Sequence, residues 1–254
     1  MRYREPAICL RTTDFSETSQ VVHFLARNYG QVKLMAKGTK RPKSKSGGAI
    51  DLLSEGDLVF IATTRDTLGT LVEFTESFPH TSLRADSDRL NTALYLIELA
   101  GLLVAEADPH PEVFDLLHNA LARLGQADAP LAAVLAFYQW RLLRRVGLLG
   151  GLEECTSCGN AIEARGKDVY FSSRQGGMIC GACEGAAAER YRLDGPTHSG
   201  LAALAALEKG AKVALDDKQA AGVNRLLAYH VTQQLGKTPR MLRHVLGAKR
   251  GTMD

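Results

Sequence analysis

The sequence predicts an α+β fold, in which a small β-barrel of five strands is followed by a bundle of helices. Up to about residue 80, short runs rich in β-branched and aromatic residues alternate with turn-forming residues. Beyond that point, the apolar residues recur at helical spacing. Two Cys-x-x-Cys pairs interrupt the helical part, which indicates a small metal-binding module inserted into it.

The first part of the chain contains five runs that are expected to form strands. These runs cover residues 7–12, 19–26, 31–36, 57–64 and 70–78. Turn formers bound most of them, namely Asp14, Gly30, Gly56 and Gly69. Five short strands in a segment of this length favour a small antiparallel barrel, and five is the strand number of an OB-fold.

After about residue 80, the sequence contains several residues that typically begin helices. Asp86 and Asp88 can cap a helix whose apolar residues are Leu90, Leu94, Ile97 and Leu102. Pro111 and Pro130 each suit the first turn of a further helix. Helical periodicity returns over residues 199–209 and 216–235, and Thr238-Pro239 opens a last short helix that runs through Leu246.

These patterns predict two domains. An OB-fold nucleic-acid-binding domain is expected over residues 1–80, and a helical domain over residues 81–254. The cysteine pairs predict a zinc-binding insertion in the helical domain at about residues 150–192.

Composition narrows the function classes. The chain has 254 residues, of which 45% are hydrophobic and 23% charged, as expected for a chain that buries a real core. No apolar run is long enough to span a bilayer and the start lacks a signal-peptide pattern, so we expect a cytoplasmic protein without membrane contact. A net charge of +3 is modest, so any affinity for nucleic acid must come from local placement of charge.

One segment concentrates positive charge. Residues 30–50, which we call the basic segment, contain no Asp or Glu, and their cations are Lys33, Lys37, Lys40, Arg41, Lys43 and Lys45. In the strand that opens this segment, Val32, Leu34 and Ala36 alternate with Lys33, Met35 and Lys37. That alternation predicts one buried face and one polar face, and the polar face leads directly into the basic loop.

Two interpretations of the basic segment compete. Charge runs are often solvated surface, and lysines can also discourage the pairing of edge strands. The acid-free length, the flanking glycines and the barrel context favour contact with nucleic acid, so we predict that the six cations bind DNA phosphates. A phosphate-cradling P-loop is excluded, because GTKRPKSK lacks the second Gly before Lys-Ser or Lys-Thr.

Four of the five cysteines form two pairs, Cys155/Cys158 and Cys180/Cys183. Each pair can deliver two thiolates from one turn, and four thiolates suit tetrahedral Zn²⁺. Disulfides are disfavoured in a reducing compartment, and a redox Cys-x-x-Cys would need only one pair. We therefore predict one structural zinc ion per chain, and we expect Cys9 to be a small core residue.

The opening segment resembles the RecO family of DNA repair proteins. The resemblance lies in ETSQVV, in the YGQV turn and in the A-K-G-x-x-R-P-x-S loop, and it covers residues 4–247. It implies a recombination mediator that binds single- and double-stranded DNA, anneals complementary strands and joins RecR. With RecR, such a protein helps RecA to replace single-strand binding protein on DNA, which implies a nucleoid-associated location.

Other features of the sequence agree with a binding protein. The barrel aromatics, Phe15, Phe24, Tyr29, Phe60, Phe74 and Phe78, are expected to be mostly core residues, so base stacking should be limited. Tyr29, beside the Gly30 turn, could either pack or stack. The seven histidines are scattered and match no catalytic motif, so we expect no enzyme.

Two further hypotheses remain open. Arg240 and Arg243 surround Met241 and Leu242, and this mixed basic and apolar surface would suit an acidic tail such as that of single-strand binding protein. Helices with solvated arginines explain the same pattern equally well. From a different class, a zinc-ribbon RNA-binding or ribosome-associated protein is the alternative to a DNA repair protein.

Overall fold

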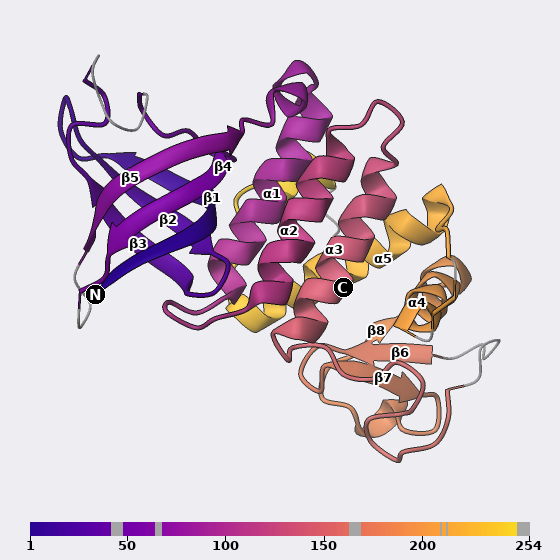
Figure 1. The fold of residues 1–254 in the computed structure, drawn as a ribbon. Helices are drawn as coiled ribbons and strands as arrows, with labels where there is room; N and C mark the ends of the chain where they lie inside the picture. The colour runs from indigo at the N-terminus through magenta and orange to yellow at the C-terminus, as the bar shows by residue number, and fades with distance from the viewer. Residues whose placement is uncertain (42–47, 64–67, 163–168, 209, 212, 248–254) are drawn as a thin grey trace. The chain divides into compact units, whose positions relative to one another are not determined.

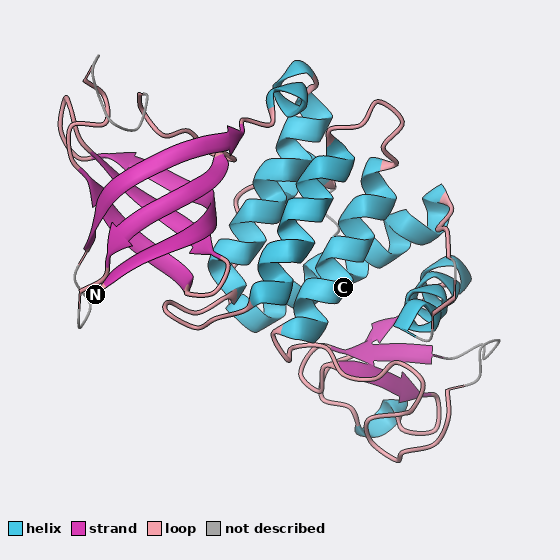
Figure 2. Cartoon of the chain, viewed as in Figure 1, coloured by secondary structure: helices cyan, strands magenta, loops and turns pink. Residues whose placement is uncertain are grey.

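The computed structural model describes residues 1–41, 48–63, 68–162, 169–208, 210–211 and 213–247. The chain forms two compact units, Met1–Ala127 and Asp128–Asp254. Figure 1 follows the chain through the elements of both units, and Figure 2 separates strands from helices. Within the described ranges, no helix has both the length and the apolar character needed to cross a membrane.

The first unit contains a closed five-stranded barrel (Figure 1). Its strands are β1 (Arg2–Asp14), β2 (Gln20–Ala26), β3 (Gly30–Ala36), β4 (Glu55–Ile61) and β5 (Gly69–Phe78). They neighbour one another in the order β1-β2-β3-β5-β4, and only the short β3–β5 ladder is parallel. This arrangement confirms the predicted OB-type barrel.

Strand β1 begins at Arg2, earlier than the expected start at Ala7. Its residues 2–8 pair with β4, and its residues 7–14 pair with β2 in a ladder whose register shifts between Cys9 and Arg11. The early residues include Arg2 and Arg4, whose exposed side chains carry no apolar strand signal. Their strand conformation comes from pairing with β4, which is distant in sequence.

The barrel core follows the predicted alternation of β3. Val32, Leu34 and Ala36 are buried, whereas Lys33 and Lys37 are exposed. Other residues buried in the same cluster are Val22, Phe24, Leu58, Phe60, Leu71 and Phe74.

Tyr29 packs against the barrel core. Its ring lies 4.9 Å from that of Tyr3 and 5.1 Å from that of Phe60, both in edge-to-face arrangements. These contacts support packing, rather than stacking on a base, as the role of Tyr29. Gly30 follows at φ +86°, and a Cβ there would lie 2.2 Å from the Asp108 carbonyl oxygen, so this turn accepts only glycine.

Two helices complete the first unit, α1 (Ser87–Leu103) and α2 (Pro111–Leu124), after a short 3₁₀ helix (Thr81–Ala85). The Asp86 carboxylate caps α1 by accepting hydrogen bonds from the N–H groups of Asp88 and Arg89. Pro111 occupies the first turn of α2. Both start signals therefore act as the sequence predicts.

The second unit combines helices with a small sheet. Its helices are α3 (Leu131–Arg145), α4 (Gly195–Glu208), α5 (Asp217–Leu235) and α6 (Leu242–Val245). Its strands are β6 (Val169–Ser172), β7 (Gly177–Cys180) and β8 (Tyr191–Arg192), in the order β7-β6-β8, with a 3₁₀ turn at Glu184–Ala186. Helix α4 starts before the expected Ser199, because Asp194 accepts a hydrogen bond from the Thr197 N–H at 2.8 Å.

A buried carboxylate joins the barrel to the elements that follow it. Glu55, at the start of β4, is only 4% exposed. One of its oxygens accepts from His80 Nε2 at 3.0 Å, and the other accepts from His118 Nδ1 of α2 at 2.6 Å. One carboxylate therefore satisfies two imidazoles from separate elements of the first unit.

We predict that Glu55→Ala destabilises the first unit by about 3 kcal/mol, because it leaves two imidazole N–H groups without their acceptor. Urea unfolding measures the change. Glu73→Ala is the matched control, since Glu73 is exposed on β5 and should change the free energy of unfolding by less than about 0.5 kcal/mol. Equal stability of the two variants would contradict a structural role for this cluster.

Candidate nucleic-acid interface and metal centre

The loop part of the basic segment lies against the turn between β1 and β2. The Lys40 N–H donates to the Thr18 carbonyl at 3.3 Å, and the Gly38 N–H donates to Ser19 Oγ at 3.3 Å. These bonds join two connections that are separated in sequence by the whole of β2 and β3. The turn and the start of the loop thus form one continuous edge of the barrel.

Gln20 holds both ends of the loop that follows β3. This residue opens β2 and is 4% exposed. Its Oε1 accepts from the Ile50 N–H at 3.0 Å and from Thr39 Oγ1 at 3.3 Å, while its Nε2 donates to the Ile50 carbonyl at 3.3 Å. A single buried amide therefore fixes where the chain leaves the barrel and where it returns.

Five of the six cations predicted to bind DNA follow β3 in the sequence. Lys37 and Arg41 are exposed beside the β1–β2 turn. Lys40 lies at the same place, where its Nζ pairs with Asp14 Oδ1 at 2.6 Å. Lys43 and Lys45 lie outside the described residues.

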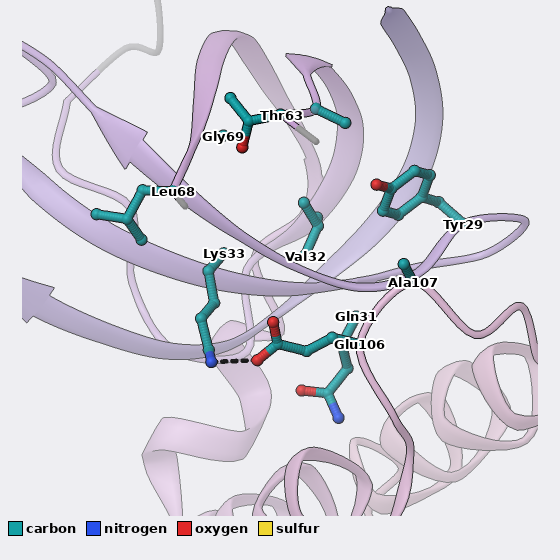
Figure 3. Close-up of a pocket in the computed structure, with 10 residues that line it drawn as sticks. Tyr29, Gln31, Val32, Lys33, Thr63, Leu68, Gly69, Glu106 and Ala107 are labelled. Carbon is teal, nitrogen blue, oxygen red and sulfur yellow. Dashed lines mark ion pairs between the residues drawn. The ribbon is translucent and has the colours of Figure 1, made fainter. Parts of the chain in front are cut away.

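Lys33 has a different environment. Its ammonium pairs with Glu106, which follows α1, and Figure 3 shows the two side chains facing each other. The pair borders a pocket of about 570 Å³ that is also lined by Tyr29, Leu68, Gly69 and Ala107. The structure thus gathers Lys37, Lys40 and Arg41 at the β1–β2 turn, while Lys33 is neutralised at a separate pocket.

Sequence reasoning missed two residues at this edge. The sequence predicts only a turn at Asp14, because no residue near it in the sequence indicates that it pairs with Lys40. Gln20 gave a weak signal, a polar residue directly before the apolar VVHFLA run, but its partners lie in a distant loop. Phe15 also differs from the expectation for barrel aromatics, since it is 66% exposed, whereas Phe24, Phe60 and Phe74 are buried as expected.

The four paired cysteines converge in the second unit. Their sulfur atoms all lie within 4.8 Å of one another, and the Sγ atoms of Cys158 and Cys180 are 3.8 Å apart. A tetrahedral site with Zn–S distances of about 2.3 Å has sulfur–sulfur edges of about 3.8 Å, whereas a disulfide needs about 2.05 Å. The donor set and its spacing therefore fit a metal ion and do not fit disulfides.

Backbone geometry positions the thiols and prepares one of them to ionise. Cys155 and Cys158 occupy a turn closed by a bond from the Gly159 N–H to the Cys155 carbonyl at 2.8 Å. Burial raises the pKa of the Cys155 thiol, but hydrogen bonds from the N–H groups of Cys180, Cys158 and Ser157 outweigh burial and lower it to about 6. Thiol–thiol hydrogen bonds with Cys158 and Cys180 raise the pKa of Cys183 to about 12. A bound cation would stabilise all four thiolates together.

The cysteine-bearing module is tied to α5. Buried His230 donates from Nε2 to the Leu148 carbonyl at 2.8 Å and accepts from the Ser173 hydroxyl at Nδ1 at 2.9 Å. Burial lowers the pKa of His230, which keeps the ring neutral, as these bonds require. The Tyr229 hydroxyl donates to Glu189, whose other oxygen accepts from Ser172 at 3.2 Å.

The predicted partner residues also lie in the second unit. Arg240 and Arg243 have exposed side chains at the start of α6, and Met241 and Leu242 between them are half-buried. Arg243 donates from Nε to His244 Nε2 at 3.0 Å. The mixed basic and apolar character predicted from the sequence is therefore present at this surface.

Comparison with known proteins covers both parts of the chain. Residues 1–78 match the family described as Recombination protein O N terminal, and residues 84–244 match Recombination protein O C terminal. The DNA repair protein RecO of Rhodopirellula baltica is 34% identical over 70% of this chain, which spans 65% of that relative, slightly less than two thirds. The DNA repair protein RecO of Anaeromyxobacter dehalogenans is 34% identical over 82% of this chain and 80% of the relative, and that of Myxococcus xanthus is 29% identical over 93% of both. The chain belongs to the RecO family.

Proposed function

We propose that this protein is a DNA-binding recombination mediator that acts in DNA repair. The observation that carries this proposal is the edge of the barrel where Gln20 fixes the basic segment beside the β1–β2 turn. The loops of an OB-fold at this position suit a nucleic-acid strand. The family matches over both parts of the chain support a role in recombination.

Phosphate recognition accounts for the chemistry of this edge. Lys37, Lys40 and Arg41 offer charged donors, and Lys43 and Lys45 continue the same run of sequence. Cations of this kind bind the backbone without reading bases, so affinity should depend on salt and be nearly independent of sequence. Such binding suits a protein that anneals complementary strands, because it must accept any strand and then release it.

The wider role follows the family expectation. In this proposal the protein binds single- and double-stranded DNA, anneals complementary strands at the nucleoid and joins RecR. Together they help RecA to load onto DNA coated by single-strand binding protein. The chain's contribution is binding and positioning, with no catalytic step.

We also propose that Cys155, Cys158, Cys180 and Cys183 hold one zinc ion with a structural role. Four protein thiolates fill a tetrahedral shell and leave no position for a reacting water. The small sheet β7-β6-β8 has a small core of its own, in which Cys155, Tyr170, Ile179 and Ala187 are buried. The metal would therefore supply much of the free energy that orders this module.

The zinc proposal predicts that replacing Cys155 and Cys180 together by Ser lowers the zinc content from about one per chain to near zero. The module should then become more sensitive to proteolysis, while DNA binding by the barrel is retained. Elemental analysis measures the metal. Cys9→Ala is the control and should keep its zinc, because Cys9 is buried in the barrel. Wild-type protein that is purified without chelator and contains no zinc would refute the assignment.

For the basic segment, we predict that changing Lys40, Arg41, Lys43 and Lys45 to Ala weakens binding to all DNA sequences alike. If about five cations contact single-stranded DNA, log affinity should fall against log salt with a slope near −3.5, and the variant should flatten this slope. Strand annealing should slow, while zinc content and thermal stability stay nearly unchanged. Fluorescence anisotropy of labelled oligonucleotides across a salt series measures the slope.

The matched control removes four exposed cations from the second unit, namely Arg141, Lys218, Arg225 and Lys237. It alters net charge equally and should leave the salt slope close to that of the wild type. If the basic-segment variant retained the wild-type salt slope, the segment would be solvated surface that does not contact DNA. Tight binding of structured RNA with no annealing of DNA would favour the RNA-binding alternative.

The Asp14–Lys40 pair generates a prediction of the opposite sign. Asp14 is largely exposed, and its carboxylate pairs with the Lys40 ammonium that a DNA phosphate would otherwise contact. Asp14→Asn should therefore increase DNA affinity by about two- to fivefold at low salt. Asp57→Asn is the control, since Asp57 pairs with Arg4 elsewhere on the barrel and its removal changes net charge equally. Equal gains in DNA affinity for the two variants would show that the effect comes from the change in net charge and not from the Asp14–Lys40 pair.

The last prediction concerns the surface around α6. We propose that Arg240 and Arg243 receive the acidic tail of single-strand binding protein, with Met241 and Leu242 as apolar contacts. Changing both arginines to Glu should weaken binding of a tail peptide about tenfold or more, and DNA binding should be unaffected. Isothermal titration with the peptide measures this, and unaltered tail affinity would remove this cluster from consideration.

A further inference from the structure

One aromatic ring of the barrel stands apart from the others. Phe24, Phe60 and Phe74 are buried in the core, and Tyr29 packs against it. Phe78 is 51% exposed, yet its ring lies 5.7 Å from that of His118 and 6.5 Å from that of His80. Phe15 is 66% exposed, and no aromatic ring among the described residues packs against it.

A backbone hydrogen bond fixes Phe15 in the turn that follows β1. Its N–H donates to the Ser19 carbonyl at 3.0 Å, which closes the turn between β1 and β2. The preceding residue, Asp14, pairs with Lys40, and Thr18 in the same turn accepts the Lys40 N–H. A largely exposed phenyl ring is therefore anchored beside the cations that we assign to phosphates.

We propose that Phe15 is a base-stacking residue that gives this DNA site a preference for single strands. The inference rests on the proposed function, since it places the ring beside a strand whose phosphates contact Lys37, Lys40 and Arg41. Every base presents a π-face, so one phenyl ring accepts any base and adds affinity without sequence preference. In a duplex, neighbouring base pairs cover those faces, and the ring gains nothing unless a step is unstacked.

In this proposal the cations and the Phe15 ring bind different parts of the DNA. The cations bind the backbone of either single- or double-stranded DNA, because both carry phosphates. The ring acts only where an unstacked base is available. A strand without bases should therefore resemble the duplex in its response to a change at Phe15.

The test compares three probes of equal length: an oligothymidylate, an abasic strand and a duplex. Phe15→Ala should weaken oligothymidylate binding about tenfold, equivalent to ~1.4 kcal/mol, and should change binding of the other two probes by less than twofold. Phe15→Trp should restore affinity for the oligothymidylate. Phe78→Ala, which removes the other exposed phenyl ring, should leave all three affinities unchanged.

Fluorescence gives a second readout that does not depend on affinity. In the Phe15→Trp variant, the native Trp140 is 1% exposed and lies outside the barrel unit, so a change in emission reports on the new indole. Stacking predicts quenching by oligothymidylate and none by the abasic strand or the duplex at saturation.

The possible outcomes distinguish failure of the stacking role from failure of the proposed DNA-binding function. Wild-type binding that depends on the basic segment, with Phe15→Ala unchanged on every probe, would overturn the stacking role alone. Equal losses on all three probes would also overturn it, because the turn would then act only through the cations. A wild-type protein that binds none of the probes would overturn the proposed function itself.

Discussion

The hydrogen bonds of the Gln20 side chain are the constraint on which the barrel edge with the basic segment depends. A buried amide that loses its hydrogen-bond partners costs about 1–3 kcal/mol of folding free energy. The Gln20 side chain therefore stabilises the positions of Thr39 and Ile50, which in turn satisfy its buried amide. These bonds hold Thr39 and Ile50, one on each side of the loop, against the start of β2. This turns a run of lysines and arginine into a local concentration of charge at a defined place on a rigid barrel.

The charge of the basic segment differs from what its acid-free sequence suggests. Asp14 and Glu106 come from other parts of the first unit and neutralise Lys40 and Lys33. Such surface pairs are weak and screened by salt, so a polyanion can displace the carboxylate. If the basic segment binds DNA as we propose, DNA would compete with these acids for Lys33 and Lys40, which would moderate affinity and favour release of the strand.

Sequence patterns predicted what local chemistry determines. The alternation in β3, the cap at Asp86 and the spacing of the two cysteine pairs each depend on neighbours within a few residues. The early start of β1 and the Glu55 cluster depend on residues that folding brings together from far along the chain, and no local pattern encodes them. For the same reason, the six predicted DNA-binding cations looked equivalent, although Lys33 lines a pocket whose lining includes neither Lys37 nor Arg41.

The central claim is that this barrel handles DNA strands without a catalytic step, and strand annealing tests it most directly. Two complementary oligonucleotides are each coated with single-strand binding protein and mixed with the purified protein, and duplex formation is followed by energy transfer between end labels. The account predicts annealing that is faster than the spontaneous rate, needs no nucleotide and slows as salt rises. An unaltered rate at protein concentrations that saturate the same strands when they are uncoated would contradict it.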